Sequence, residues 1–197
     1  MENSNLKTII LIGRSGCGKG TQANLLVHKL EEEGEAPVLY LETGQRFRDF
    51  IEGPSFSSMR SREIMDMGAL QPSFLATWMW ANELIEKMTG REHLVIDGSP
   101  RKLNEATALA SALSFYGRAK PIVIHLNVTR DWARERLMSR GRADDIDIAD
   151  IEKRLDWFDK EVAPAIEFFR NDERFQFLDI NGERSIEIIQ QDILDYI

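Results

Sequence analysis

The stretch LIGRSGCGKGTQANLL, residues 11–26, decides the fold of this 197-residue chain. The run Ile9–Ile12 at its start is wholly apolar, which is typical of a strand buried on both faces. Four glycines then fall within positions 13–20, and apolar residues recur at helical spacing over 20–33. The stretch therefore predicts a strand, a tight turn and a helix in direct succession.

The chemistry of this turn points to phosphate. Glycines let the backbone approach a bound group closely, and the N–H groups and positive dipole end of a helix N-terminus favour an anion. Lys19 adds a mobile full charge at the start of the helix. The pattern G-x-x-x-x-G-K-[ST] is met except that Gly20 replaces the hydroxyl residue, which arrives one position later as Thr21. The turn predicts a phosphate-binding loop and phosphoryl transfer, the alternative being a glycine-rich turn of another α/β protein.

Strand-length apolar runs alternate with helix-length stretches along the rest of the chain. Helical spacing of apolar residues marks 20–33, 129–139 and 184–197. This alternation predicts an α/β fold with a parallel five-stranded sheet that is covered by helices on both faces. The five predicted strands are Thr8–Ile12, Val38–Leu41, His93–Ile96, Pro121–Val128 and Phe175–Ile180.

Two segments interrupt the alternation. Residues 42–92 are more than one crossover helix needs, and their mostly helical pattern, with a break at Gly53-Pro54, predicts an inserted helical subdomain. Within it, the spacing of Trp78, Trp80, Leu84 and Ile85 predicts one buried helix face. The polar run SRGRADDIDIAD, residues 139–150, predicts a loop between two helices.

Composition narrows the class of protein. The net charge is −8, from 33 acidic and 25 basic residues, so a broad nucleic-acid-binding face is not expected. The chain has no signal pattern at its start and no apolar run of membrane-spanning length, so we expect a cytoplasmic protein with no membrane contact. One cysteine, Cys17, and three scattered histidines predict neither a disulfide framework nor a structural metal site.

Five short motifs follow one another along nearly the whole chain. They are GRSGCGKGTQ at 13–22, ETGQRFR at 42–48, IMDMGALQP at 64–72, VIDGSPR at 95–101 and GRADD at 141–145. In order and spacing they resemble the motifs of the adenylate kinase family of nucleoside monophosphate kinases. That family also carries a glycine at the position of Gly20, so the departure from the strict loop pattern is itself part of the resemblance.

The resemblance implies a P-loop kinase fold and the reaction ATP + NMP to ADP + NDP, with AMP as the first candidate and Mg²⁺ as the cofactor of ATP. It implies a single kinase domain over 1–197 with a very short lid, and a monomer. The implied parts are a core of 1–42, 93–138 and 151–197, an NMP-binding subdomain of 43–92 and a minimal lid of 139–150.

The resemblance also implies the site residues. The catalytic residues would be Lys19, Arg101, Arg140, Arg142 and Arg154, and Thr21 and Asp97 would hold Mg²⁺ through water. ATP would contact Ser15, Gly16, Cys17, Gly18, Lys19, Gly20, Thr21, Arg136, Arg140 and Arg184. The monophosphate would contact Thr43, Gly44, Arg48, Ala69, Leu70, Gln71, Gly98, Ser99, Pro100, Arg101, Glu105, Arg142 and Arg154.

These residue types suit the chemistry, because phosphoryl transfer between two polyanions depends on cancelling charge, and arginine contacts phosphate with two parallel donors. Each arginine has an alternative as a solvated surface residue, and Asp97 has one as the cap of the following turn. Glu105 stands where the family has a glutamine that reads the acceptor base, and a carboxylate only accepts hydrogen bonds. Its alternative is to face solvent or to pair with Lys102.

Two further readings of function stay open at this point. Within the class, Glu105 favours a kinase that prefers GMP, CMP or UMP over AMP. Outside it, the chain is a non-catalytic or regulatory ATP-binding protein that keeps the phosphate loop, although such a protein has no need of the acceptor arginines Arg48 and Arg101.

Overall fold

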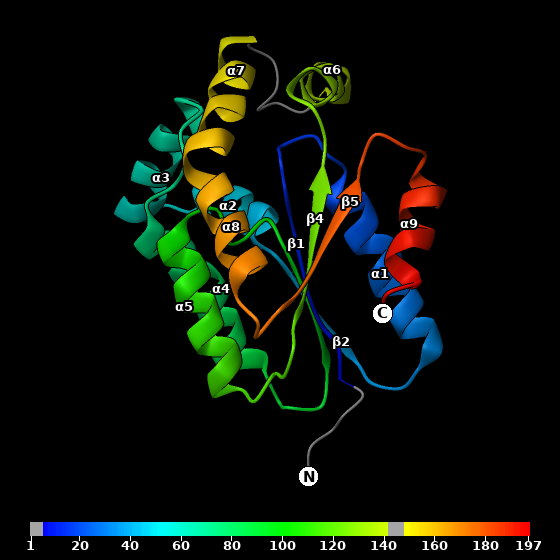
Figure 1. Ribbon diagram of the computed structural model, residues 1–197. Helices are drawn as coiled ribbons and strands as arrows, with labels where there is room; N and C mark the ends of the chain where they lie inside the picture. The colour runs from blue at the N-terminus through cyan, green and yellow to red at the C-terminus, as the bar shows by residue number, and fades with distance from the viewer. Residues whose placement is uncertain (1–5, 142–147) are drawn as a thin grey trace.

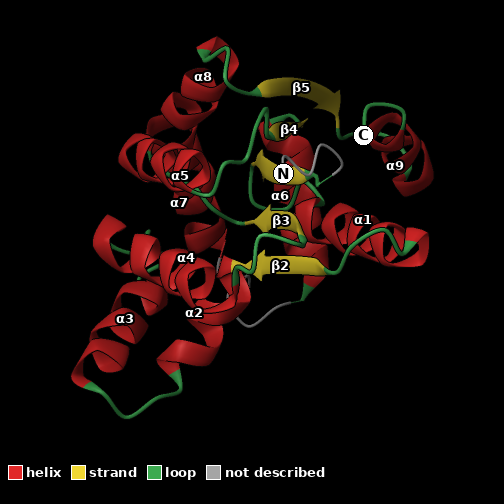
Figure 2. Ribbon diagram, turned by 90° about the horizontal axis from the view of Figure 1, so that it is seen from below, coloured by secondary structure: helices red, strands yellow, loops and turns green. Residues whose placement is uncertain are grey.

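A five-stranded parallel sheet forms the centre of the molecule. The computed structural model describes residues 6–141 and 148–197. The strands stand in the order β2-β3-β1-β4-β5, stacked edge to edge in Figure 2. The predicted strands are confirmed, with ends that differ by at most one residue. Their bounds are β1 (Thr8–Gly13), β2 (Val38–Glu42), β3 (His93–Asp97), β4 (Ile122–Asn127) and β5 (Gln176–Asn181).

Helices cover both faces of the sheet, as the alternation predicts. Side chains of a strand point to opposite faces in turn, so Ile9 and Leu11 of β1 enter one hydrophobic cluster and Ile10 and Ile12 enter the other. Figure 1 shows the two layers on either side of the strands. The first layer includes α1 (Lys19–Glu33) and α9 (Ile186–Leu194), and the second α4 (Ser73–Lys87), α5 (Leu103–Phe115) and α8 (Ala163–Asn171).

The long segment between β2 and β3 is helical, as predicted. It contains α2 (Thr43–Ile51), α3 (Phe56–Asp66) and α4, and Gly53-Pro54 lies in the break between the first two. Phe47, Leu75 and Met79 form a small cluster of their own. This cluster packs α2 against α4 at the side of the sheet, where Figures 1 and 2 both place them.

The prediction of one buried face on α4 is wrong for two of its four residues. Trp80 and Leu84 are buried, but Trp78 is 48% and Ile85 75% exposed. An α-helix turns about 100° per residue, so a step of two residues, as from Trp78 to Trp80, crosses to the opposite side. The spacing contains two stripes, and only the one with Trp80 and Leu84 faces the core.

Two helices lie over the carboxyl ends of the strands. These are α6 (Arg130–Arg140) and α7 (Ile148–Trp157), at the top of Figure 1. Both helices extend into the predicted loop of 139–150, which is wrong at its two ends, and residues 142–147 lie outside the described part. A π-helical turn, η2 (Phe158–Val162), continues α7 into α8. Among the described helices, none is long and apolar enough to cross a membrane.

Candidate active site

A cleft of about 640 Å³ opens at the carboxyl ends of the strands. β1 lies between β3 and β4, so the turns that follow these strands meet there. The cleft is lined by the turn after β1, the turn after β3, the starts of α2 and α5, and residues of α6 and α7. It brings together almost all the residues that the sequence assigns to the site.

The glycine-rich turn after β1 forms one wall. Gly16 and Gly18 have φ of 85° and 95°, which a glycine adopts without strain. No described side chain caps α1, whose N-cap is Gly18, so the first-turn N–H groups are available to an anion. Lys19 Nζ lies over the loop and donates to the carbonyl oxygens of Gly13 (2.9 Å) and Arg14 (2.8 Å). The loop is preformed as a phosphate cradle.

Gly20 brings the start of α1 close to the end of β3. A Cβ at this position would lie 3.5 Å from Asp97 Oδ2, an ordinary van der Waals contact. Thr21, one residue on, lines the cleft and supplies the hydroxyl instead.

Two buried oxygens in the cleft are available to contact a ligand. Asp97 Oδ1 and Thr43 Oγ1 have no hydrogen-bond partner within 6–141 and 148–197. Burial raises the pKa of Asp97 above its usual range, and the positive charges of Lys19 and Arg101 oppose this rise. Because buried polar atoms are costly when unpaired, both positions fit the contact surface of a polar molecule or a hydrated cation.

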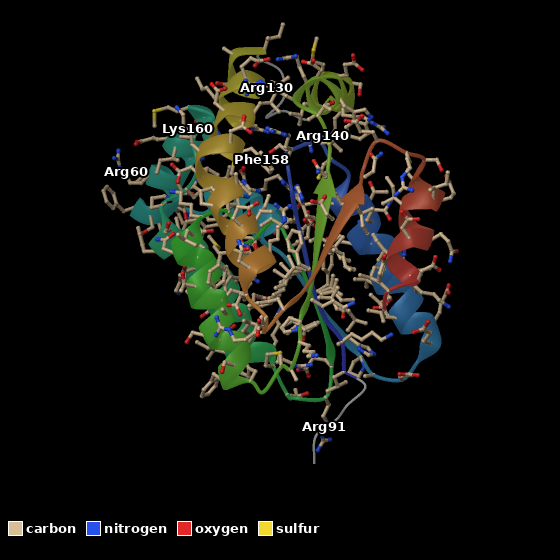
Figure 3. All side chains as sticks on the ribbon, in the orientation of Figure 1. Arg60, Arg91, Arg130, Arg140, Phe158 and Lys160 are labelled. Atoms are coloured by element: carbon tan, nitrogen blue, oxygen red, sulfur yellow. The ribbon has the colours of Figure 1, made fainter. Side chains whose placement is uncertain are left out.

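Arginines from separate segments converge on the same cleft. Arg101 donates from Nε to the Gly98 carbonyl oxygen at 2.9 Å, and burial lowers its pKa, against the carboxylates of Glu105 and Asp97. Arg154 on α7 is buried and Arg140 ends α6; both line the cleft. Figure 3 places Arg140 at this end of the molecule, whereas Arg91 lies at the other. These arginines are not scattered surface charges.

Arg48 also lines the cleft, from α2. It donates to the side chains of Gln45 (2.7 Å) and Glu42 (3.1 Å), which hold it in place. The predicted site residue Arg142 lies outside the described residues, together with the rest of the GRADD motif after Gly141.

Glu105 is buried, so the alternative that places it in solvent is wrong. Its Oε2 accepts from the backbone N–H of Arg101 at 2.8 Å, and the residue lines the cleft. Burial raises the pKa of the Glu105 carboxyl, while that hydrogen bond and the nearby Arg101 and Lys102 lower it.

Gln71 lines the cleft, and its side-chain amide is bound to Ser61. Its amide bonds at both ends to Ser61, through Oε1 to the hydroxyl (3.0 Å) and through Nε2 to the carbonyl oxygen (2.9 Å). The backbone of 69–71 is therefore what this segment offers to a ligand. Thr43, Gly44, Ala69, Leu70, Gly98 and Ser99, which the sequence assigns to the monophosphate, also line the cleft, whereas Pro100 lines a smaller cavity.

The opposite end of the cleft holds Arg136 and Arg184. The Arg136 guanidinium carbon lies 4.7 Å from the centre of the Trp132 ring, a cation–π contact. Arg184 donates to the Asn181 carbonyl oxygen at 3.2 Å and pairs with Asp192. Both side chains are thus held at the rim by neighbouring residues.

Sequence reasoning missed two tryptophans that line the cleft, Trp132 and Trp157. The available signal was their position, four residues before Arg136 and three after Arg154 on the same helices. No group of three or more His, Cys, Asp or Glu able to hold a metal occurs in the described part of the chain.

Comparison with known proteins gives a matching family model and several relatives of similar length. The family model described as "Adenylate kinase" matches residues 11–174. The chain is 30% identical over 187 residues to the adenylate kinase of Prochlorococcus marinus (strain AS9601), covering 95% of this chain and 96% of that protein. It is 33% identical over 181 residues to the adenylate kinase of Corynebacterium glutamicum (strain R), covering 92% and 93%.

Proposed function

Because the chain belongs to the adenylate kinase family, it is a nucleoside monophosphate kinase, and we propose that its reaction is ATP + AMP to 2 ADP. The observation that carries this proposal is the layout of the cleft. A phosphate loop forms one wall, and the same cleft is lined by Arg48 and Thr43 of the insertion, the latter with an unpartnered hydroxyl, and by Arg101, Arg140 and Arg154 of the core and α7. Two phosphorylated molecules fit such a layout better than one.

The donor end is proposed to bind ATP. The loop residues Ser15, Gly16, Cys17, Gly18, Gly20 and Thr21 surround its phosphates with backbone N–H groups, and Lys19 exchanges its carbonyl partners for phosphate oxygens. Arg136, with one face on Trp132, offers the other to the adenine, and Arg184 lies near it. No general base is required, because positioning and charge account for catalysis of phosphoryl transfer.

The acceptor end is proposed to hold the monophosphate. Arg48 and Arg101 clamp its phosphate, while Arg140, Arg142 and Arg154 stabilise the group in transfer. Thr43, Gly44 and the backbone of 69–71 contact its base and sugar, next to Gly98, Ser99 and Pro100. Arginine suits these roles because its planar fork contacts phosphate with two donors.

The residues present fit Mg²⁺ bound to ATP. The described part of the chain has no protein cage for the ion, but the buried Asp97 Oδ1 lacks a partner and Thr21 lies close by in the same cleft. A Mg²⁺ that keeps several waters is held in this manner, by substrate phosphates and one or two side chains. When bound, the ion neutralises phosphate charge, and Asp97 and Thr21 orient its water ligands.

The proposed parts of the molecule follow the motifs. They are a core of 1–42, 93–138 and 151–197, an NMP-binding subdomain of 43–92 and a minimal lid of 139–150. The monomeric state and the cytoplasmic location stay predictions.

A preference for GMP is the second candidate, and Glu105 favours it. With one oxygen bound to the Arg101 N–H, its buried carboxylate still lines the cleft as an acceptor. Guanine presents two N–H donors side by side, whereas adenine presents a donor beside an acceptor that would face a carboxylate oxygen. The same residue leaves CMP and UMP as further candidates. A regulatory ATP-binding role has less support, since it gives the acceptor arginines nothing to bind.

The test is a coupled assay with ATP and each of AMP, GMP, CMP and UMP, on the wild type and on Glu105→Gln. The amide still accepts from the Arg101 N–H, so the fold is preserved. An unpaired buried acceptor costs about 1 to 3 kcal/mol, so the AMP-to-GMP ratio of kcat/KM should rise about tenfold or more in the variant. Glu173→Gln, on the surface, is the control. An unchanged ratio would remove Glu105 from base recognition.

A further inference from the structure

One face of α7 holds the backbone that follows α3. Asp150, Lys153 and Trp157 are spaced i, i+3 and i+7 and therefore lie along one stripe of the helix. Lys153 Nζ donates to the Met67 carbonyl oxygen at 3.2 Å, and Trp157 Nε1 donates to that of Gly68 at 3.1 Å. The stripe thus ties the insertion to the core of the molecule.

Gly68 packs closely against α7. Its φ of 65° favours glycine, and a Cβ there would lie 3.0 Å from Asp150 Oδ1, so a side chain at 68 would require the Asp150 side chain to shift by a few tenths of an ångström. The backbone of Gly68 is therefore in close contact with α7.

The segment held in this way is part of the cleft. Gly68, Ala69 and Leu70 line it, and so does Trp157 itself. The Trp157 ring also lies 5.9 Å from the guanidinium carbon of Arg101, within cation–π distance. One side chain thus contacts both the backbone proposed to face the acceptor and an arginine proposed to clamp its phosphate.

We propose that Trp157 is a positioning residue for the acceptor: its indole N–H fixes the 68–70 backbone and its ring supports the Arg101 guanidinium. The inference rests on the proposed function, since it assigns that backbone and arginine to the monophosphate. Indole suits both tasks, because it is a rigid plane with a single N–H donor at its edge. The two contributions are separable by substitution.

Trp157→Phe keeps an aromatic face and removes the donor. The KM for the monophosphate is expected to rise about fivefold, the effect of one lost hydrogen bond, while kcat and the KM for ATP stay within about twofold. Trp157→Leu also removes the face, so kcat is expected to fall as well, by about tenfold. Trp78→Phe, a change at an exposed tryptophan outside the cleft, is the matched control and leaves all three constants unchanged.

Amide hydrogen exchange of residues 65–71 supplies a readout that does not depend on turnover. Trp157→Phe should speed exchange there and leave α1 unchanged. An unchanged KM for the monophosphate, or equal rises in both KM values, would overturn the inference. If Trp157→Phe does not fold, Lys153→Met removes the neighbouring contact on the same stripe and must shift KM and exchange in the same direction. If the wild type phosphorylates no monophosphate, the proposed function fails, and unchanged exchange then also overturns the contact.

Discussion

At the scale of single residues, Lys19 is the charge on which the phosphate loop depends. Its Nζ is already placed over the loop by the carbonyl oxygens of Gly13 and Arg14. A phosphate in the cradle would meet an ammonium group beside it, which exchanges these carbonyl partners for phosphate oxygens. Preorganised charge of this kind accounts for much of the rate in phosphoryl transfer.

Lys19→Ala should lower kcat by roughly 10² or more, because one lost transition-state donor is typically worth about 3 kcal/mol. Circular dichroism should be unchanged. Lys29→Ala, on the same helix and paired with Glu33, is the control and should keep the activity of the wild type. A Lys19→Ala enzyme with near wild-type kcat would show that the loop does not hold the transferring phosphate.

The buried carboxyl of Asp97 lowers the free energy of unfolding at neutral pH, although it serves the proposed binding of Mg²⁺. Burial raises its folded-state pKa above the usual 3.8, so its contribution to stability is largest at low pH and is lost as pH rises through the folded pKa. At pH 7, Asp97→Asn should raise the free energy of unfolding, because the amide avoids the cost of holding an ionised carboxyl in a buried position. Urea unfolding at several pH values measures this.

The gain from Asp97→Asn should shrink toward pH 3, where the wild-type carboxyl is protonated, and kcat should fall about tenfold or more. Asp66→Asn, exposed at the end of α3, is the control for loss of one negative charge. A variant that is less stable than the wild type at pH 7 would contradict this account of Asp97.

At the scale of elements, ion pairs join α6 to α7, the helices that precede and follow the segment 141–147. Arg130 donates to Glu152 (2.6 Å) and Asp156 (2.7 Å), and Arg134 also pairs with Glu152. Hydrogen bonds from Arg134 and then Arg130 lower the pKa of Glu152 to about 2. The pairs hold α7, with Arg154 and Trp157, over the cleft.

Glu152→Gln should therefore speed amide hydrogen exchange in α7 at pH 7. Because the folded-state pKa is below the usual 4.5, the effect of the pairing is full above pH 4.5 and is lost as pH falls toward 2. The difference between variant and wild type should close over that range. Asp131→Asn is the matched control, since it also removes one negative charge and Asp131 pairs with Arg134 within α6. Equal exchange in α7 for both variants would contradict the role of the Glu152 ion pairs in holding α7.

The elements themselves were largely predictable, since strands and helices follow local periodicity. The buried face of α4 was not predictable, because Trp78 and Trp80 are the same residue type and only the packed fold decides which one is buried. The positions of Trp132 and Trp157 beside Arg136 and Arg154 were a signal for the cleft, but their contacts could not be predicted. The contact between Trp157 and Gly68 joins residues 89 positions apart, and no local pattern encodes it.

At the scale of the whole molecule, the sheet order turns separate motifs into one site. Placing β1 between β3 and β4 brings the phosphate loop, the Gly98–Arg101 turn and the start of α6 to the same edge. The chain carries a net charge of −8, yet its cleft gathers arginines from several segments. The positive charge is local, as a protein that binds small anions requires.

The central claim is that this cleft passes a phosphoryl group directly from ATP to a nucleoside monophosphate. It is tested most directly with Mg²⁺ and ATP labelled in its γ-phosphate, mixed with AMP, GMP, CMP or UMP in turn, and by following where the label goes. We expect the label in the β-phosphate of the nucleoside diphosphate. The rate of this transfer should be reduced by roughly 10² or more in Lys19→Ala. Label that appears only as inorganic phosphate with every monophosphate, or that stays in ATP, would contradict the account.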